Sequence, residues 1–219
     1  MNRPATQILV SALLVLVFIA LIADGVRRAA EVPQKLRLSR INKFIPSEAV
    51  LKEAAAKIEQ GQPVDDDIAS GLLRYYEQVS KSCPQLADAW GMRGYWYYQK
   101  AQAAQAVSAY QQAAQLAPGF FWFHYNLGVL FLKQDNPQQA LGHIDAALQA
   151  NPSASLNFIF NSAHIYMPWV RQKANPQQVI AELKRGYDDC EKLKLLAALA
   201  VKKPQEVQKI VSSLDLAPY

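Results

Sequence analysis

The 219-residue sequence is poor in the residues from which most catalytic and metal sites are built, with two cysteines and three histidines. Cys83 and Cys190 are far apart in the chain, so neither belongs to a local zinc motif or a redox pair. His124, His143 and His164 lie in different predicted helices, and none has a carboxylate or second histidine at ligand spacing within its own helix. We therefore expect structural or solvated histidines and no metal site.

Glycine is also scarce, with nine residues scattered along the chain. The sequence has no glycine-rich phosphate loop and no Gly-x-Ser-x-Gly turn. The formal net charge of +5 is too small to indicate nucleic-acid binding by itself. These absences favour a protein that is not an enzyme, with no cofactor, no small-molecule substrate and no nucleic acid.

A 34-residue pattern is written twice in succession between Ala87 and Pro152. In the first copy Trp90, Gly94 and Tyr97 fall at i, i+4 and i+7, which places them on one face of a helix. A second helix follows, and a proline ends it. Self-similarity of this length is typical of stacked helical hairpins, each of which buries its apolar face against the next. The recurring residues are Gly94, Ala106, Ala113 and Pro118, then Gly128, Ala140, Ala147 and Pro152.

At these positions the chain resembles the tetratricopeptide repeat (TPR) family, whose pattern is a large residue, Gly, an aromatic, two alanines around an aromatic, and then proline. The second copy departs from it, with His124 at the large apolar position and Ile144 at the second aromatic position. The residues expected to pack the repeats together are Trp90, Gly94, Tyr97, Ala106, Tyr110, Ala113, Pro118, Gly128, Ala140, Ala147 and Pro152.

The resulting expectation is an all-α fold in which residues 47–219 form an α-solenoid of about five TPR-like hairpins. The clearest repeats are residues 87–120 and 121–154, and Ser47 is a plausible N-cap for the first helix. Residues 188–214 read as a final, more charged pair of helices, with the polar outer face that the end of a solenoid requires.

Before the repeats, residues 8–23 form an uncharged run that, with residues 5–7, reaches the length of a short membrane helix. We predict a single transmembrane anchor over residues 1–24. The alternative is a secretory signal peptide, but residues 21–23 make a poor small-residue cleavage site.

Residues 25–46 follow as a basic linker that lies next to the predicted anchor. Only Arg3 precedes the apolar run, whereas six basic residues follow it within about twenty positions, which favours a cytoplasmic C-terminal side. The expected localisation is a single-pass protein of the inner or plasma membrane with a cytoplasmic repeat domain. The periplasmic or extracytoplasmic side stays open, and a disulfide between Cys83 and Cys190 would be allowed there.

Aromatic residues are concentrated where charges are rare, since residues 84–160 hold six charges and fourteen of the twenty-two aromatics. A helix buries only one or two of its faces, so part of this set should be exposed. In proteins of the TPR family, one face of the first helices lines a concave groove that binds peptides or helices. Helical geometry assigns to that face Tyr95, Tyr98, Trp122, Tyr125, Asn126, Val129, Leu132, Ile159 and Tyr166.

This lining is apolar and aromatic, and suits a hydrophobic segment or helix rather than an acidic C-terminus. The function expected is a membrane-anchored interaction scaffold or assembly factor, whose protein partners are components of a membrane complex. The alternative function is a non-catalytic accessory or regulatory subunit of a membrane enzyme or of a secretion or assembly complex. A second alternative concerns the groove alone, which the C-terminal helix would fill by folding back.

Overall fold

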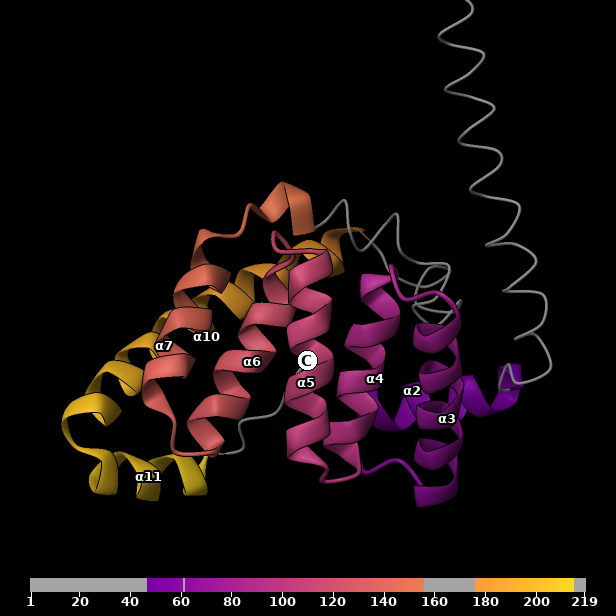
Figure 1. Ribbon diagram of the computed structural model, residues 1–219, viewed down its shortest axis with the longest axis horizontal. Helices are drawn as coiled ribbons and strands as arrows, with labels where there is room; N and C mark the ends of the chain where they lie inside the picture. The colour runs from indigo at the N-terminus through magenta and orange to yellow at the C-terminus, as the bar shows by residue number, and fades with distance from the viewer. Residues whose placement is uncertain (1–46, 61, 156–175, 215–219) are drawn as a thin grey trace, which may run out of the picture. The chain divides into compact units, whose positions relative to one another are not determined.

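The computed structural model describes residues 47–60, 62–155 and 176–214, and every regular element in these ranges is an α-helix (Figure 1). The chain divides into two units, Met1–Phe44 and Ile45–Tyr219, and the described residues all belong to the second. The helices are α2 (Glu48–Glu59), α3 (Asp66–Ser82), α4 (Ala87–Gln99), α5 (Ala103–Leu116), α6 (Phe121–Lys133), α7 (Pro137–Gln149), α10 (Pro176–Lys202) and α11 (Pro204–Ser213).

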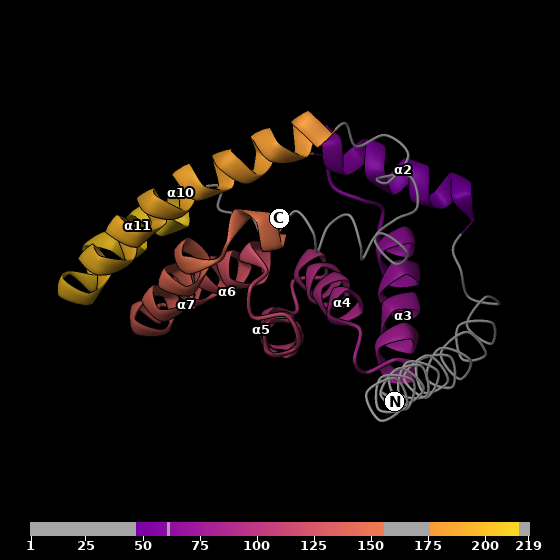
Figure 2. The same cartoon turned by 90° about the horizontal axis from the view of Figure 1, so that it is seen from above.

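Two consecutive hairpins, α4 with α5 and α6 with α7, form the centre of the fold, and they confirm the helical hairpin repeats predicted from the 34-residue pattern. Helix α3 packs on α4, and α5 packs on α6. Helix α10 lies against α7 and touches α6, and α11 packs on α10 (Figure 2). Each hairpin is thus held by the one before it and the one after it, as expected for a solenoid.

The two hairpin turns repeat the same backbone geometry. Ala101 and Asp135 stand 34 residues apart and have positive φ angles of 56° and 55°. After the first of them, the N–H of Gln102 donates to the carbonyl of Tyr97 at 2.8 Å. Such a bond satisfies a carbonyl that the helix end leaves without a partner. The 34-residue sequence repeat is therefore also a repeat of the turn conformation.

Within each hairpin a glycine of the first helix allows a large side chain of the second helix to approach. A Cβ on Gly94 would lie 2.9 Å from the ring of Tyr110, and a Cβ on Gly128 would lie 2.7 Å from Ile144. Both large residues are essentially inaccessible to solvent. The small residues of the pattern therefore let the paired helices pack closely.

Trp90 differs from its expected role as a fully packed residue. Its indole is half-buried, its Nε1–H donates to the carbonyl of Pro84 at 2.9 Å, and the guanidinium of Arg93 lies over the ring. The inaccessible tryptophan of α4 is Trp96. Helix α4 therefore buries the second of these two tryptophans and leaves the first half-buried.

The C-terminal part corrects an expected helix boundary. Residues 176–202 form one helix of 27 residues, so there is no break before Asp188. Leu183, Cys190 and Ala197 lie on one buried face of this helix, and that continuous contact carries it past the expected boundary. The distorted repeat predicted around Pro168 lies outside the described residues.

The predicted membrane localisation is also corrected. The expected anchor, residues 1–24, and the linker, residues 25–46, lie outside the described residues. In the part of the chain that the structure describes, no helix has both the length and the apolar character needed to cross a bilayer. Helix α10 has the length but carries charged side chains along most of it. This finding contradicts the single-pass membrane protein with a cytoplasmic domain that the sequence led us to expect.

Candidate interaction surface

The face predicted to form an open groove is closed over most of α6. Tyr125, Val129 and Leu132 are at most 4% exposed, and Asn126 is equally inaccessible. Three further residues of the predicted set are half-buried, namely Tyr95, Tyr98 and Trp122. The last two, Ile159 and Tyr166, lie outside the described residues.

Helix α10 covers the N-terminal end of this face. Gly186 approaches so closely that a Cβ there would lie 2.9 Å from the Phe121 ring and closer still to Trp122. The ring of Tyr187 stacks on Phe121 with centroids 4.3 Å apart, and its hydroxyl donates to the carbonyl of Ala150. Trp122 therefore contacts another helix of its own chain and is not an open anchor at this end of the face.

Contacts between α4 and α6 include Tyr98, another of the half-buried aromatics. The ammonium of Lys133 donates to the hydroxyl of Tyr98 at 2.9 Å and lies 5.3 Å from the centre of its ring. Gly91 makes room for the ring of Phe123 between the two helices. These contacts hold neighbouring repeats in register and leave Tyr98 only partly available to a partner.

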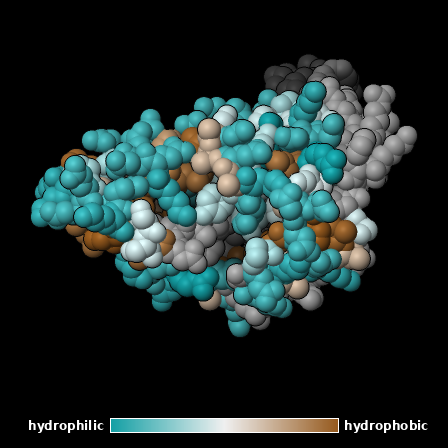
Figure 3. Space-filling view, turned by 90° about the horizontal axis from the view of Figure 1, so that it is seen from below, coloured by the Kyte–Doolittle hydropathy of each residue, from teal (hydrophilic) through white to brown (hydrophobic). Residues whose placement is uncertain are grey.

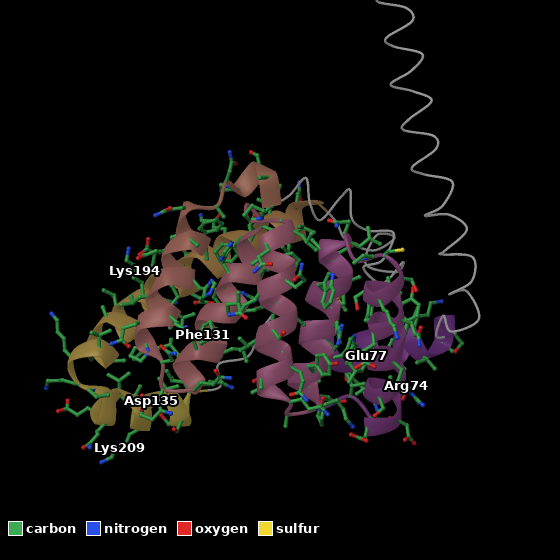
Figure 4. The ribbon with its side chains drawn as sticks, in the orientation of Figure 1. Arg74, Glu77, Phe131, Asp135, Lys194 and Lys209 are labelled. Atoms are coloured by element: carbon green, nitrogen blue, oxygen red, sulfur yellow. The ribbon has the colours of Figure 1, made fainter. Side chains whose placement is uncertain are left out.

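A polar network joins α3 to α4. The hydroxyl of Tyr97 donates to Glu77 at 2.6 Å, and the guanidinium of Arg93 donates to that hydroxyl at 3.1 Å and to Ser80 at 3.4 Å. Burial raises the pKa of Tyr97. Figure 4 marks Glu77 on α3, where it faces α4. Because its charges and hydroxyls bond to one another, the network fits a structural role.

Asp88 is the one carboxylate that α4 buries. Its side chain is 4% exposed, and its Oδ1 accepts from the N–H of Ala89 at 3.1 Å. Loss of hydration raises the pKa of Asp88 from 3.8 to about 6. The same cause raises the pKa of Tyr95 to about 12. No ion pair reaches Asp88 from the described residues, so its ionised form is stabilised only by backbone N–H groups at the start of α4.

The large apolar side chains that remain exposed in the described residues belong to the C-terminal helices. Leu195 is 74% exposed, which is the largest value among them. In Figure 3 the left end of the molecule, where Figure 1 places α10 and α11, is mostly hydrophilic, with a small hydrophobic area along its lower edge. The exposure of these side chains differs from the polar outer face predicted for the last pair of helices. Ile180 is also exposed, near the N-terminal end of α10. The other five lie in the last two turns of α10, on α11 or just after it, and we call them the terminal apolar surface: Leu195, Leu199, Val201, Ile210 and Leu214.

Comparison with known families agrees with the repeat geometry. The TPR repeat family model matches residues 94–135, from within α4 to the turn after α6. This part of the chain is TPR-like. The match supports the TPR family and protein–protein interaction as its general mode of action. No curated protein matches the chain.

Lysines surround the terminal apolar surface of this TPR-like domain. Lys194 pairs with Asp145 of α7 at 2.8 Å, and Lys203 pairs with Glu206 at 3.1 Å. Lys202 and Lys209 make no ion pair with any described residue. Figure 4 shows Lys209 projecting from α11 away from the other helices. Two lysines near the apolar side chains, Lys202 and Lys209, therefore carry positive charge that no ion pair among the described residues neutralises.

The sequence does contain a signal for this surface that the TPR pattern does not use. Val207, Ile210, Val211 and Leu214 follow an i, i+3, i+4, i+7 spacing, which makes α11 strongly amphipathic. Val207 and Val211 pack against Ala200 of α10, and the other two remain at the surface. The spacing predicts that these four residues share one face of the helix, but it does not predict which of them α10 covers.

Proposed function

We propose that the TPR-like domain is a non-catalytic scaffold that binds a protein partner on its terminal apolar surface. The observation that carries the proposal is the exposure of Leu195, Leu199, Val201, Ile210 and Leu214 at the end of a repeat array. Grouped exposed apolar side chains rimmed by polar residues mark interaction sites on soluble domains. The predicted groove is a poorer candidate, because Tyr125, Val129 and Leu132 are buried.

The partner that fits this surface is an amphipathic helix with apolar anchors and acidic flanking residues. Leu195 and Leu199 are one helical turn apart and offer adjacent contacts to such anchors. Lys202 and Lys209 carry positive charge that is not neutralised by the described residues. Acidic side chains on the partner would complement this charge, raise the association rate and orient the helix.

Site-specific photo-crosslinking in the source cells tests the location of the binding site. A photoreactive residue replaces Leu195 in one variant and Ile210 in another, and Gln115, exposed on α5, is the matched control position. We expect the two terminal positions to give the same crosslinked protein, identified by mass spectrometry, and the control position to give none of it. The identified partner should contain a helix of the chemistry described above.

Crosslinks found only at Gln115, or different proteins at Leu195 and Ile210, would contradict a single terminal binding site. Because both terminal side chains are exposed, their replacement should alter stability by no more than about 0.5 kcal/mol. Circular dichroism of each variant checks that the helices are intact.

A further inference from the structure

His124 and Trp90 occupy equivalent positions 34 residues apart, and their rings make the same hydrogen bond. Trp90 Nε1–H donates to the carbonyl of Pro84, and His124 Nε2 lies 3.1 Å from the carbonyl of Pro118. A carbonyl oxygen can only accept, so Nε2 of His124 carries the proton. The other ring nitrogen of His124, Nδ1, therefore presents a lone pair.

That lone pair faces a second histidine. Nδ1 of His143, on α7, lies 3.2 Å from Nδ1 of His124, on α6. The ring of His143 is stacked on Phe131 at an angle of 10°, with 5.5 Å between centroids. In the metal-free protein the two nitrogens share one proton, which His143 donates to His124.

The spacing of the two nitrogens matches that of two ligands on one metal ion. Zinc binds histidine nitrogen at about 2.0–2.1 Å in tetrahedral geometry, in which ligand nitrogens subtend about 109° at the metal. Two nitrogens 3.2 Å apart, each about 2.05 Å from one ion, subtend about 103° at that ion. A cation could thus replace the shared proton after a rotation of the rings, without separation of α6 from α7.

The surroundings suit such an ion. The Pro118 carbonyl orients His124 in the way that backbone carbonyls orient metal-bound histidines. Both rings are only half-buried, so water can reach the remaining coordination positions. No group of three or more metal-binding side chains occurs in the described residues, so protein atoms supply two ligands.

We propose that His124 and His143 form a two-histidine site for a divalent cation of the zinc class, completed by water. The ion would link the two helices of the second repeat through one nitrogen from each. This site is separate from the terminal apolar surface, so it is independent of the proposed function. It also replaces the structural or solvated role that the sequence suggested for both residues.

Two variants remove the site, and each introduces the residue that the preceding repeat has at the equivalent position. His143→Ala introduces the residue found at Ala109, 34 positions earlier, and His124→Trp introduces the residue found at Trp90. The matched control is His164→Ala, which removes the third histidine of the chain. Isothermal titration with Zn²⁺ at pH 7.5 measures affinity and stoichiometry.

We expect one Zn²⁺ per chain for the wild type and for His164→Ala, and at least tenfold weaker binding for the two site variants. The melting temperature of the wild type should rise with Zn²⁺ concentration, because an ion bound only by the folded state stabilises it. Absence of saturable binding up to about 1 mM Zn²⁺ would overturn the proposal, as would unchanged affinity in His143→Ala. If a site variant fails to fold, histidine NMR of the wild type decides, since the resonances of His124 and His143 must shift together on addition of Zn²⁺.

Discussion

At the scale of single residues, Asp88 gives the clearest prediction of pH dependence. Its pKa rises from 3.8 to about 6 in the folded protein because the carboxylate is buried. A raised pKa means that the folded state holds the proton more tightly than the unfolded state. The stabilisation is therefore complete below pH 3.8 and is lost as the pH rises through about 6. At neutral pH the shift of about two pKa units costs about 3 kcal/mol.

Asp88→Asn should remove that cost, since asparagine keeps the size of the side chain and the acceptor for the Ala89 N–H. We expect the free energy of unfolding to increase by up to about 3 kcal/mol at pH 7.5 and by less than about 1 kcal/mol at pH 4. Urea titrations of both proteins at the two pH values measure the difference. The histidines are the same in both proteins, so their contribution to the pH dependence cancels in the difference between the two free energies of unfolding. An equal gain at both pH values would show that ionisation of Asp88 is not the cause.

At the scale of helices, substitution of Gly186 tests whether α10 packs against α6. A methyl group there would collide with the rings of Trp122 and Phe121, which are rigid. A methyl group on Gly142, in the middle of α7, would meet no atom within 4 Å, so this glycine gives the matched control. Both substitutions to alanine bring the same gain in helix propensity, of about 1 kcal/mol.

We expect Gly142→Ala to raise the free energy of unfolding by about that amount and Gly186→Ala to lower it by about 1–3 kcal/mol. Urea denaturation of the two variants beside the wild type gives the comparison. Similar stabilisation by both would mean that α10 does not contact the aromatic face of α6, and that this face is open.

The helical elements were predictable where a local signal sets them. Ser47 caps α2 as expected, with its hydroxyl accepting from the N–H of Val50 at 3.4 Å. Gly94 and Gly128 meet large side chains as the repeat pattern implies. The burial of Trp96 was not predictable in this way, because the repeat pattern assigns the packed position of α4 to Trp90 and not to Trp96.

At the scale of the whole molecule, the repeat pattern predicts the hairpins but not the surface that they leave open. A helix face is defined by its own sequence, whereas its exposure is decided by what packs on it. Tyr125 and Val129 share the expected face and are buried all the same. Leu195 lies in a charged segment that reads as a polar end, yet it is the most exposed large apolar residue of the described part of the chain.

The affinity of the crosslinked partner, purified and titrated against three forms of the domain, tests the account most directly. Leu195→Asp should weaken binding by about 30-fold, which corresponds to about 2 kcal/mol for a central apolar contact. Tyr98→Ala, on the predicted groove face, should change the dissociation constant by no more than about twofold, since Tyr98 bonds to Lys133 within the domain. The opposite result, a large loss for Tyr98→Ala and none for Leu195→Asp, would place the partner in the groove and contradict the terminal binding site.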